Sequence, residues 1–149
     1  MLSGLCFFSR GTILAVFNKT RSMDNRLQKL VIVCDNDADH SFTLEGELRN
    51  RNYEVIIITD ATELIGSAKS LKPVAVLINP DVKGFNGNNI CKSLMQEMNI
   101  PFILLLDKNS THRASIGECR VEDTVTKPVE VENLANLIAK QMAWHKSNP

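Results

Sequence analysis

The stretch AVLINPDVKGFNG (Ala75–Gly87) decides the fold. Its first four residues are aliphatic, which is typical of a short strand that is buried on both faces of a sheet. The run ends at Asn79, and a loop with two glycines precedes a stretch of helical period. In open α/β sheets the functional groups lie at the carboxyl ends of the strands. The stretch therefore predicts that Asn79, a neutral amide, stands where such a protein usually does its chemistry.

Apolar runs like this one alternate with amphipathic stretches through most of the chain. The predicted strands are residues 30–34, 53–59, 74–78, 101–106 and 121–126, and the predicted helices are 38–51, 61–71, 88–98, 110–117 and 130–144. Asp37 or Asp39 is available to cap the first helix. Short apolar strands that alternate with helices indicate a parallel sheet covered on both faces. Five such units predict the α/β class, a flavodoxin-like (βα)5 three-layer sandwich with strand order 2-1-3-4-5.

Length and composition indicate one soluble globular domain. The chain has 149 residues, of which 44% are hydrophobic and 23% are charged, and its formal net charge is zero. A neutral chain gives no sign of binding nucleic acid or an anionic membrane. No apolar run approaches the roughly 20 residues that span a bilayer. We therefore expect a cytoplasmic protein with neither nucleic acid nor membrane among its partners.

Residues 1–22 differ in composition from residues 23–149. They hold three basic residues and no acid, so the rest of the chain carries a net charge of −3. Arg10 interrupts the apolar part, which a secretory signal would keep continuous. We interpret residues 1–22 as a poorly ordered leader or an upstream extension before a natural start at Met23, and residues 23–149 as the domain. An organelle transit peptide stays open.

The cysteines and histidines lack the spacing of a metal site. Cys34 lies within an apolar run and is expected to be a buried thiol. We expect all four cysteines to be free, as in a reducing cytoplasm, with a metal or disulfide role left open. The histidines stand among polar residues and are expected to be solvated. The residues concerned are Cys6, Cys34, Cys91, Cys119, His40, His112 and His145.

Polar residues follow four of the predicted strands and would meet at one edge of the sheet. They are Asp35-Asn36-Asp37, Asn79, Asp107 after Leu106, and Thr126-Lys127-Pro128. Carboxylates are the ligands that Mg²⁺ prefers, and a lysine neutralises phosphate. Such a cluster indicates a site for magnesium and phosphate.

These residues resemble a known family, the receiver domains that accept phosphate in bacterial response regulators. The stretches that carry the resemblance are LVIVCDNDADHSFTLEGELRNRNYEV (30–55), LKPVAVLINPDVKGFNGNNICKSL (71–94), IPFILLL (100–106) and DTVTKPVEVENL (123–134). The likeness extends from about Lys29 to Met142. It implies a CheY-like fold and a role in two-component signal transduction or a phosphorelay.

The match to the family's acidic site is partial. Family members hold magnesium with two adjacent acids, whereas this chain has Asp35 followed by the amide Asn36, with Asp37 just after. The aspartate that the family phosphorylates falls on Asn79. An amide cannot form an acyl phosphate, because its nitrogen lone pair is delocalised and its oxygen is neutral.

The family's switch positions also differ here. The Ser or Thr that contacts the phosphoryl group falls on Leu106, which has no hydrogen to donate. The aromatic residue that turns inward on activation falls on Thr124. Only Lys127 and Pro128 are kept, and by analogy their peptide bond is expected to be cis.

The resemblance therefore implies a degenerate receiver, or pseudo-receiver, that is not an enzyme and needs no cofactor. Mg²⁺ binding is expected to be weak or absent, with Asp35 its one certain ligand. We expect Asn79 to hydrogen-bond Lys127 or a loop backbone, or to mimic a locked signalling state. Lys127 is expected to pair with Asp35 or Asp37.

The expected activity is binding of a protein partner through the face of the fourth helix, fifth strand and fifth helix (110–117, 121–126 and 130–144). A homodimer through this face stays open. Trp144 either packs the last helix onto the sheet or takes part in docking. Two alternatives are a receiver that is phosphorylated on a substitute aspartate (Asp81, Asp35 or Asp37), and a sensor of a small molecule or nucleotide that uses Lys127.

Overall fold

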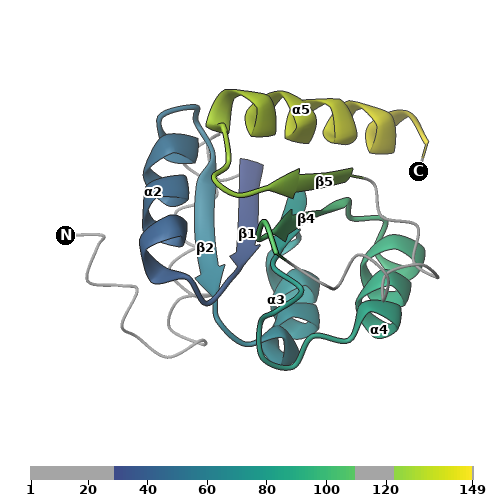
Figure 1. Ribbon diagram of the computed structural model, residues 1–149. Helices are drawn as coiled ribbons and strands as arrows, with labels where there is room; N and C mark the ends of the chain where they lie inside the picture. The colour runs from purple at the N-terminus through teal and green to yellow at the C-terminus, as the bar shows by residue number, and fades with distance from the viewer. Residues whose placement is uncertain (1–28, 110–122, 149) are drawn as a thin grey trace.

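A five-stranded parallel sheet forms the middle of the molecule (Figure 1). The computed structural model describes residues 29–109 and 123–148. The strands are β1 (Leu30–Cys34), β2 (Glu54–Ile58), β3 (Ala75–Ile78), β4 (Phe102–Leu106) and β5 (Asp123–Thr126). Their order is β2-β1-β3-β4-β5, and every neighbouring pair is parallel. The predicted fold class and strand order are confirmed.

Helices cover both faces of this sheet and complete three layers. Figure 1 shows α2 and α5 on one face and α3 with α4 on the other. The helical segments are α2 (Ala38–Arg49), the 3₁₀ turn η3 (Ala61–Glu63), α3 (Leu64–Leu71), α4 (Gly87–Cys91), the π-helical segment η4 (Lys92–Glu97) and α5 (Val131–Ser147). The helix expected over 88–98 is thus divided into an α and a π part. The helix expected at Ser110–Gly117 lies outside the described residues.

Side chains along the central strands point alternately to the two faces of the sheet, so the core has two parts. Val31 and Val33 of β1 pack with α2 and α5, whereas Ile32 and Cys34 pack with α3 and α4. All five residues of β1 are buried. Successive strand side chains point to opposite faces, so a strand in the middle layer needs apolar residues at every position. This requirement explains why the central strands were readable as continuous apolar runs.

The first turn of α2 is fixed by Asp37. Its carboxylate oxygen Oδ1 accepts the backbone N–H of His40 at 3.1 Å, which satisfies one of the free donors at the helix start. The cap holds the connection from β1 to α2 in a short turn. Asp35 and the start of α2 therefore lie close together at the carboxyl edge of the sheet.

Three sequence predictions about cysteine and histidine are wrong. Cys91 is disulfide-bonded, and spacing along the chain could not reveal it. His145 is buried, and its Nδ1 lies 2.8 Å from Oδ1 of Asn99, because the spacing of α5 turns residues 134, 138, 141 and 145 inward. His40 is partly buried beside Asp35. Cys34 is a free, buried thiol as expected.

No helix within residues 29–109 and 123–148 has the length and apolar character to cross a bilayer. Trp144 on α5 is 51% exposed, so it is not covered by the described core.

Candidate functional site

The ends of four strands bring the candidate site residues to one edge of the sheet. The backbone N–H of Asp35 donates to the carbonyl of Ile58 at 3.0 Å, and that of Asn79 donates to the carbonyl of Cys34 at 2.9 Å. Across the sheet, the N–H of Lys127 donates to the carbonyl of Leu106 at 2.8 Å. These bonds extend the strand ladders beyond β1, β3 and β5. The three side chains are therefore positioned by rigid backbone.

Asp35 is the centre of the site, and its carboxylate is fully buried. Oδ1 accepts hydrogen bonds from Nδ2 of Asn79 at 3.0 Å and from the backbone N–H of Asp37 at 3.1 Å. Oδ2 lies 2.7 Å from Nζ of Lys127 and 3.4 Å from Nδ1 of His40. Each oxygen thus has two partners from the protein itself.

These contacts keep Asp35 ionised in spite of its burial. Burial by itself would raise the pKa of a carboxyl group, because a buried charge loses its hydration. Contact with Lys127 and the hydrogen bonds from Asn79 and Asp37 act in the opposite direction, and together they lower the pKa of Asp35 below its usual value. Asp35 is therefore a carboxylate at neutral pH, balanced by the Lys127 ammonium.

Asn79 uses both ends of its amide and is 2% exposed. While Nδ2 donates to Asp35, Oδ1 accepts the backbone N–H of Asp81 at 2.9 Å. The N–H of Asp81 requires an acceptor and Oδ1 of Asp35 requires a donor, which fixes the orientation of the amide. An ionised aspartate could supply the acceptor but not the donor. The site is built for an amide at position 79.

Lys127 faces three carboxylates, but one of them dominates. Its Nζ lies 3.6 Å from Oδ1 of Asp107 and 3.9 Å from Oδ2 of Asp37, compared with 2.7 Å from Asp35. Asp37 and Asp107 are about half exposed, so water screens their share of the attraction. The Lys127 side chain is 9% exposed and is held against the buried carboxylate.

The other predicted positions lie around this cluster in different environments. Leu106 is buried in the core between the sheet and α3 and α4, and its side chain brings no polar atom to the site. Thr124 is exposed on the edge strand β5, and Asn36 is exposed after β1. The peptide bond between Lys127 and Pro128 is cis, as expected.

Magnesium is implied by the family resemblance, but the residues as arranged do not fit it. Mg²⁺ is held by oxygen lone pairs, usually those of carboxylates. Here Asn79 turns its nitrogen toward Asp35, both oxygens of Asp35 already accept donors, and Asp37 caps α2. Within residues 29–109 and 123–148, no group of three His, Cys, Asp or Glu side chains is placed to hold a metal ion. Weak or absent Mg²⁺ binding stays a prediction.

His40 is the site residue that sequence reasoning missed. It stands in the first turn of α2, five positions after Asp35, and only the tight Asp37 cap brings its ring to the carboxylate. No pattern of apolar residues marks such a contact. The one available signal was the cap itself, which fixes the direction of the first helical turn.

Comparison with known proteins points to one family, although no family model matches the chain. The response regulator MtrA of Mycobacterium tuberculosis, described as DNA-binding, is 26% identical over 128 residues, which are 85% of this chain and 56% of MtrA. MtrA of Mycobacterium leprae is 24% identical over 124 residues. The chain thus spans just over half the length of the curated relatives it matches.

Solved structures show the same fold. The receiver domain of a modulated diguanylate cyclase from Desulfovibrio desulfuricans has a TM-score of 0.72 at 19% identity, covering 80% of this chain and 98% of that domain. The receiver domain of a sensor histidine kinase from Pseudomonas aeruginosa, with magnesium in its active-site cleft, has a TM-score of 0.68 at 17% identity, covering 77% and 98%. The chain is a homologue of the receiver domains of response regulators, the regulators of two-component signalling.

Proposed function

We propose that this chain is a pseudo-receiver that acts in signal transduction by binding a protein partner, without phosphorylation at position 79. The observation that carries the proposal is the hydrogen bond from Nδ2 of Asn79 to the buried carboxylate of Asp35, at 3.0 Å. It places a hydrogen-bond donor where phosphoryl transfer needs a nucleophilic oxygen. The proposed role is non-enzymatic.

The chemistry of the site supports this reading. A phosphoryl acceptor must offer an anionic oxygen, and the amide of Asn79 offers a neutral oxygen that already accepts the N–H of Asp81. Lys127, which would neutralise a phosphoryl group, is committed to Asp35 at 2.7 Å. At the switch position, the buried Leu106 has no hydrogen to donate to a phosphoryl oxygen. Three separate requirements of the phosphorylation switch are unmet.

The surface of β5 and α5 is the proposed contact face. Trp144 is half exposed on α5 and packs edge-on against the buried ring of His145, with 5.0 Å between the ring centroids. Tryptophan is enriched among the residues that anchor protein interfaces. Residues 110–117, the third part of the predicted face, lie outside the described residues.

A homodimer through this face and a location in the cytoplasm are parts of the proposal. The disulfide at Cys91 does not support the cytoplasmic location, because disulfides are rare in a reducing cytoplasm.

The decisive test of phosphorylation is incubation with acetyl phosphate and Mg²⁺, followed by intact-protein mass spectrometry. We expect no phosphoryl adduct on the wild-type chain. An adduct that disappears in Asp81→Ala would instead establish a substitute acceptor and contradict the proposal. Thermal-shift measurements with nucleotides test the sensor alternative, for which stabilisation would be lost in Lys127→Ala.

The contact face is tested by a matched pair of aromatic substitutions. Phe42 on α2 is 76% exposed and lies on a different helix, which makes Phe42→Ala the control for Trp144→Ala. Self-association is measured by sedimentation velocity, and affinity for a partner recovered from the native host is measured by calorimetry. We expect Trp144→Ala to weaken either association and Phe42→Ala to leave it unchanged. Equal effects would remove α5 as the contact face.

A further inference from the structure

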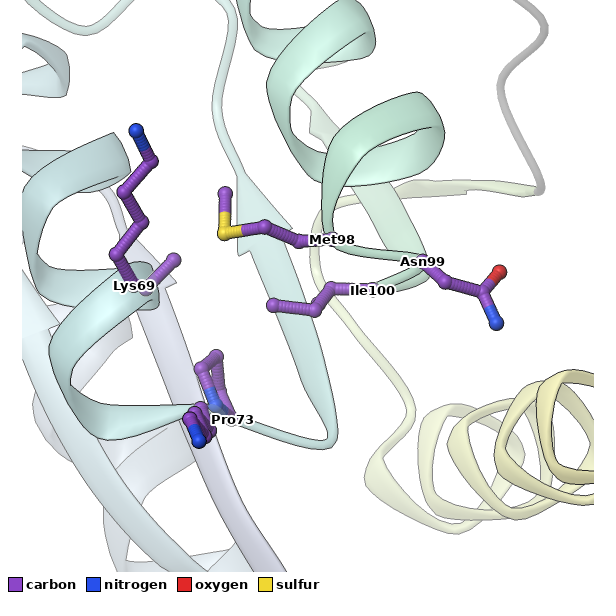
Figure 2. A pocket seen from close by; sticks show the side chains of 7 residues that line it. Lys69, Pro73, Met98, Asn99 and Ile100 are labelled. Atoms are coloured by element: carbon purple, nitrogen blue, oxygen red, sulfur yellow. The ribbon is translucent and has the colours of Figure 1, made fainter. Parts of the chain in front are cut away.

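A groove lies at the opposite edge of the sheet from Asp35, between α3 and the connection that leads into β4. It has a volume of about 430 Å³. Its lining comes from the end of α3 (Ala68 and Lys69), from Lys72 and Pro73 just after it, and from residues 98–100. Figure 2 shows the Met98 and Ile100 side chains reaching across it toward α3, and Lys69 standing at its margin. We propose that this groove binds a small amphipathic carboxylate, with the hydrocarbon part inside and the charged end at the lysines.

Apolar side chains form the floor of the groove, and polar atoms are exposed around them. Ala68, Pro73 and Ile100 are buried, and Met98 is partly buried at the wall. Methionine is unbranched and adapts its shape to a ligand. Asn99 does not add polarity to the interior, because its side chain is turned toward α5, where Oδ1 lies 2.8 Å from Nδ1 of His145 (Figure 2). The interior therefore favours a hydrocarbon chain or ring over a sugar or a base.

The charged residues of the lining all have one sign. Lys69 lies in the last turn of α3, Lys72 is the residue that ends the helix in a left-handed conformation, and both are exposed and line the groove. No carboxylate is among the lining residues. A ligand that complements the groove must present a negative group next to an apolar body. Residues 1–22 of this chain, with three basic residues and no acid, have the wrong charge for it.

The size of the groove points to a small molecule. Sites for small ligands usually enclose about 300–1,000 Å³ and combine apolar walls with a few polar groups at one side. A groove of about 430 Å³ lies at the lower end of this range. A short aliphatic chain with one carboxylate fits this volume and complements the positive charge of the lining.

The two lysines also have a structural explanation that the test must separate from ligand binding. Cations at the end of a helix offset the partial negative charge of its last carbonyl groups. In that case, replacing Lys69 and Lys72 would lower stability but would not depend on any ligand. A binding measurement with charged and uncharged ligands distinguishes the two roles.

The test uses the 149-residue chain, with octanoate as the probe and 1-octanol as its uncharged counterpart. Binding is measured by isothermal titration calorimetry, and the fluorescence of Trp144, the only tryptophan of the chain, gives a second signal because its neighbour His145 contacts Asn99. The variants are Lys69→Glu/Lys72→Glu for charge and Met98→Gln for the apolar wall. Lys140→Glu on α5 is the control, since Lys140 is exposed and does not line the groove.

We expect saturable binding of octanoate and much weaker binding of octanol. The double lysine variant should bind octanoate about tenfold more weakly, as expected for two exposed ion pairs, and the Lys140→Glu control should bind as wild type does. Met98→Gln should weaken octanoate binding while its circular dichroism stays native. The proposal would be overturned if octanol bound as tightly as octanoate, or if the double variant bound octanoate with unchanged affinity. It would also be overturned if millimolar octanoate showed no saturable binding. None of these results bears on phosphorylation at the other edge of the sheet.

Discussion

Replacing Asn79 by aspartate restores the residue that the family phosphorylates, and we expect it to destabilise this protein. The change removes the donor that Asp35 receives at 3.0 Å and puts a second carboxyl group in its place. Asn79 is 2% exposed and Asp35 is fully buried, so solvent cannot separate the two groups. The perturbation is therefore one of charge, with almost no change of volume.

The cost of Asn79→Asp at pH 7 has a lower and an upper bound. Losing a hydrogen bond to a charged group costs about 2 kcal/mol. Two ionised carboxylates at 3.0 Å would repel by about 5.5 kcal/mol at an effective dielectric constant of about 20. The new carboxyl group can avoid this repulsion by binding a proton, which costs about 4 kcal/mol at pH 7 for a group with a pKa of about 4. We therefore expect a loss of about 2–4 kcal/mol in the free energy of unfolding.

The pH dependence of this loss follows from the proton. A carboxyl group beside Asp35 has a raised pKa in the folded state, so the folded variant binds a proton that the unfolded variant has released. Its stability relative to wild type therefore rises as the pH falls from 7 toward 4. A protonated carboxyl group at position 79 can donate to Asp35 as the amide does, and the difference should then become small.

Magnesium provides the second signature of Asn79→Asp. Two adjacent carboxylates form a better Mg²⁺ site than a carboxylate with an amide nitrogen. For a Kd of about 1 mM, about 10 mM Mg²⁺ would add about 1.4 kcal/mol to the stability of the variant. The wild-type chain should show no such gain. Asn79→Ala is the control, because it removes both amide hydrogen bonds without adding a titrating group or a metal ligand.

Urea denaturation of the three proteins at pH 5 and pH 7, with and without Mg²⁺, checks these expectations. An aspartate variant as stable as wild type at pH 7 in the absence of Mg²⁺ would refute the reasoning from the 3.0 Å contact. A saturable stabilisation of the wild-type chain by Mg²⁺ would refute the conclusion that its site does not fit the metal.

Further expectations concern single residues of the core and the loops. Lys127→Met leaves Asp35 buried without its cation, so it should cost about 3–5 kcal/mol in urea denaturation, and the double variant with Asp35→Asn should cost less than this single change. In the wild-type chain the pKa of Asp35 is lowered, so this group stabilises the fold at pH values above the usual carboxyl pKa. The free energy of unfolding should therefore fall as the pH drops through and below that range. Asp35→Asn should make the free energy of unfolding depend less on pH. Burial, with a contribution from the charge of Asp35, raises the pKa of Cys34 to about 12, so iodoacetamide at pH 8 should label it only after unfolding, as peptide mass spectrometry can show. Gly84→Ala should cost about 1–3 kcal/mol in urea denaturation, because φ is +79° and the added Cβ would lie 2.7 Å from Cγ2 of Thr62.

The sequence was sufficient for the fold because the central strands are buried on both faces. β1 and β4 are buried at all five positions, and such strands appear as unbroken apolar runs. The π-helical segment η4 was not foreseen, because a stripe of apolar residues between Ile90 and Met98 fits an α-helix as well. Helical periodicity reports which side is buried, and it does not report how tightly each turn is wound.

The site was only partly readable from the sequence. The end of β3 marked Asn79 as a site position, but we expected its amide to contact Lys127 or a loop backbone. The structure places it between Asp35 and the N–H of Asp81. Which end of the amide faces Asp35 depends on neighbouring residues from other strands, and the pattern of residues along the chain does not predict it. The burial of His145 could have been predicted, because it continues the inward spacing of residues 134, 138 and 141, but its contact with Asn99, 46 positions away, could not.

The arrangement around Asp35 also limits how far this domain can switch. A receiver that responds to a signal must have two conformations that differ little in free energy. In this chain a second conformation of the site would separate Asp35 from Lys127 at 2.7 Å and from Asn79 at 3.0 Å. Breaking a buried ion pair without replacing a partner costs about 3–5 kcal/mol, so a conformation of that kind would be populated below about 1%. If a partner binds the proposed face of β5 and α5, we expect it to recognise the conformation described here, because the energy needed to change it exceeds what one or two exposed contacts supply.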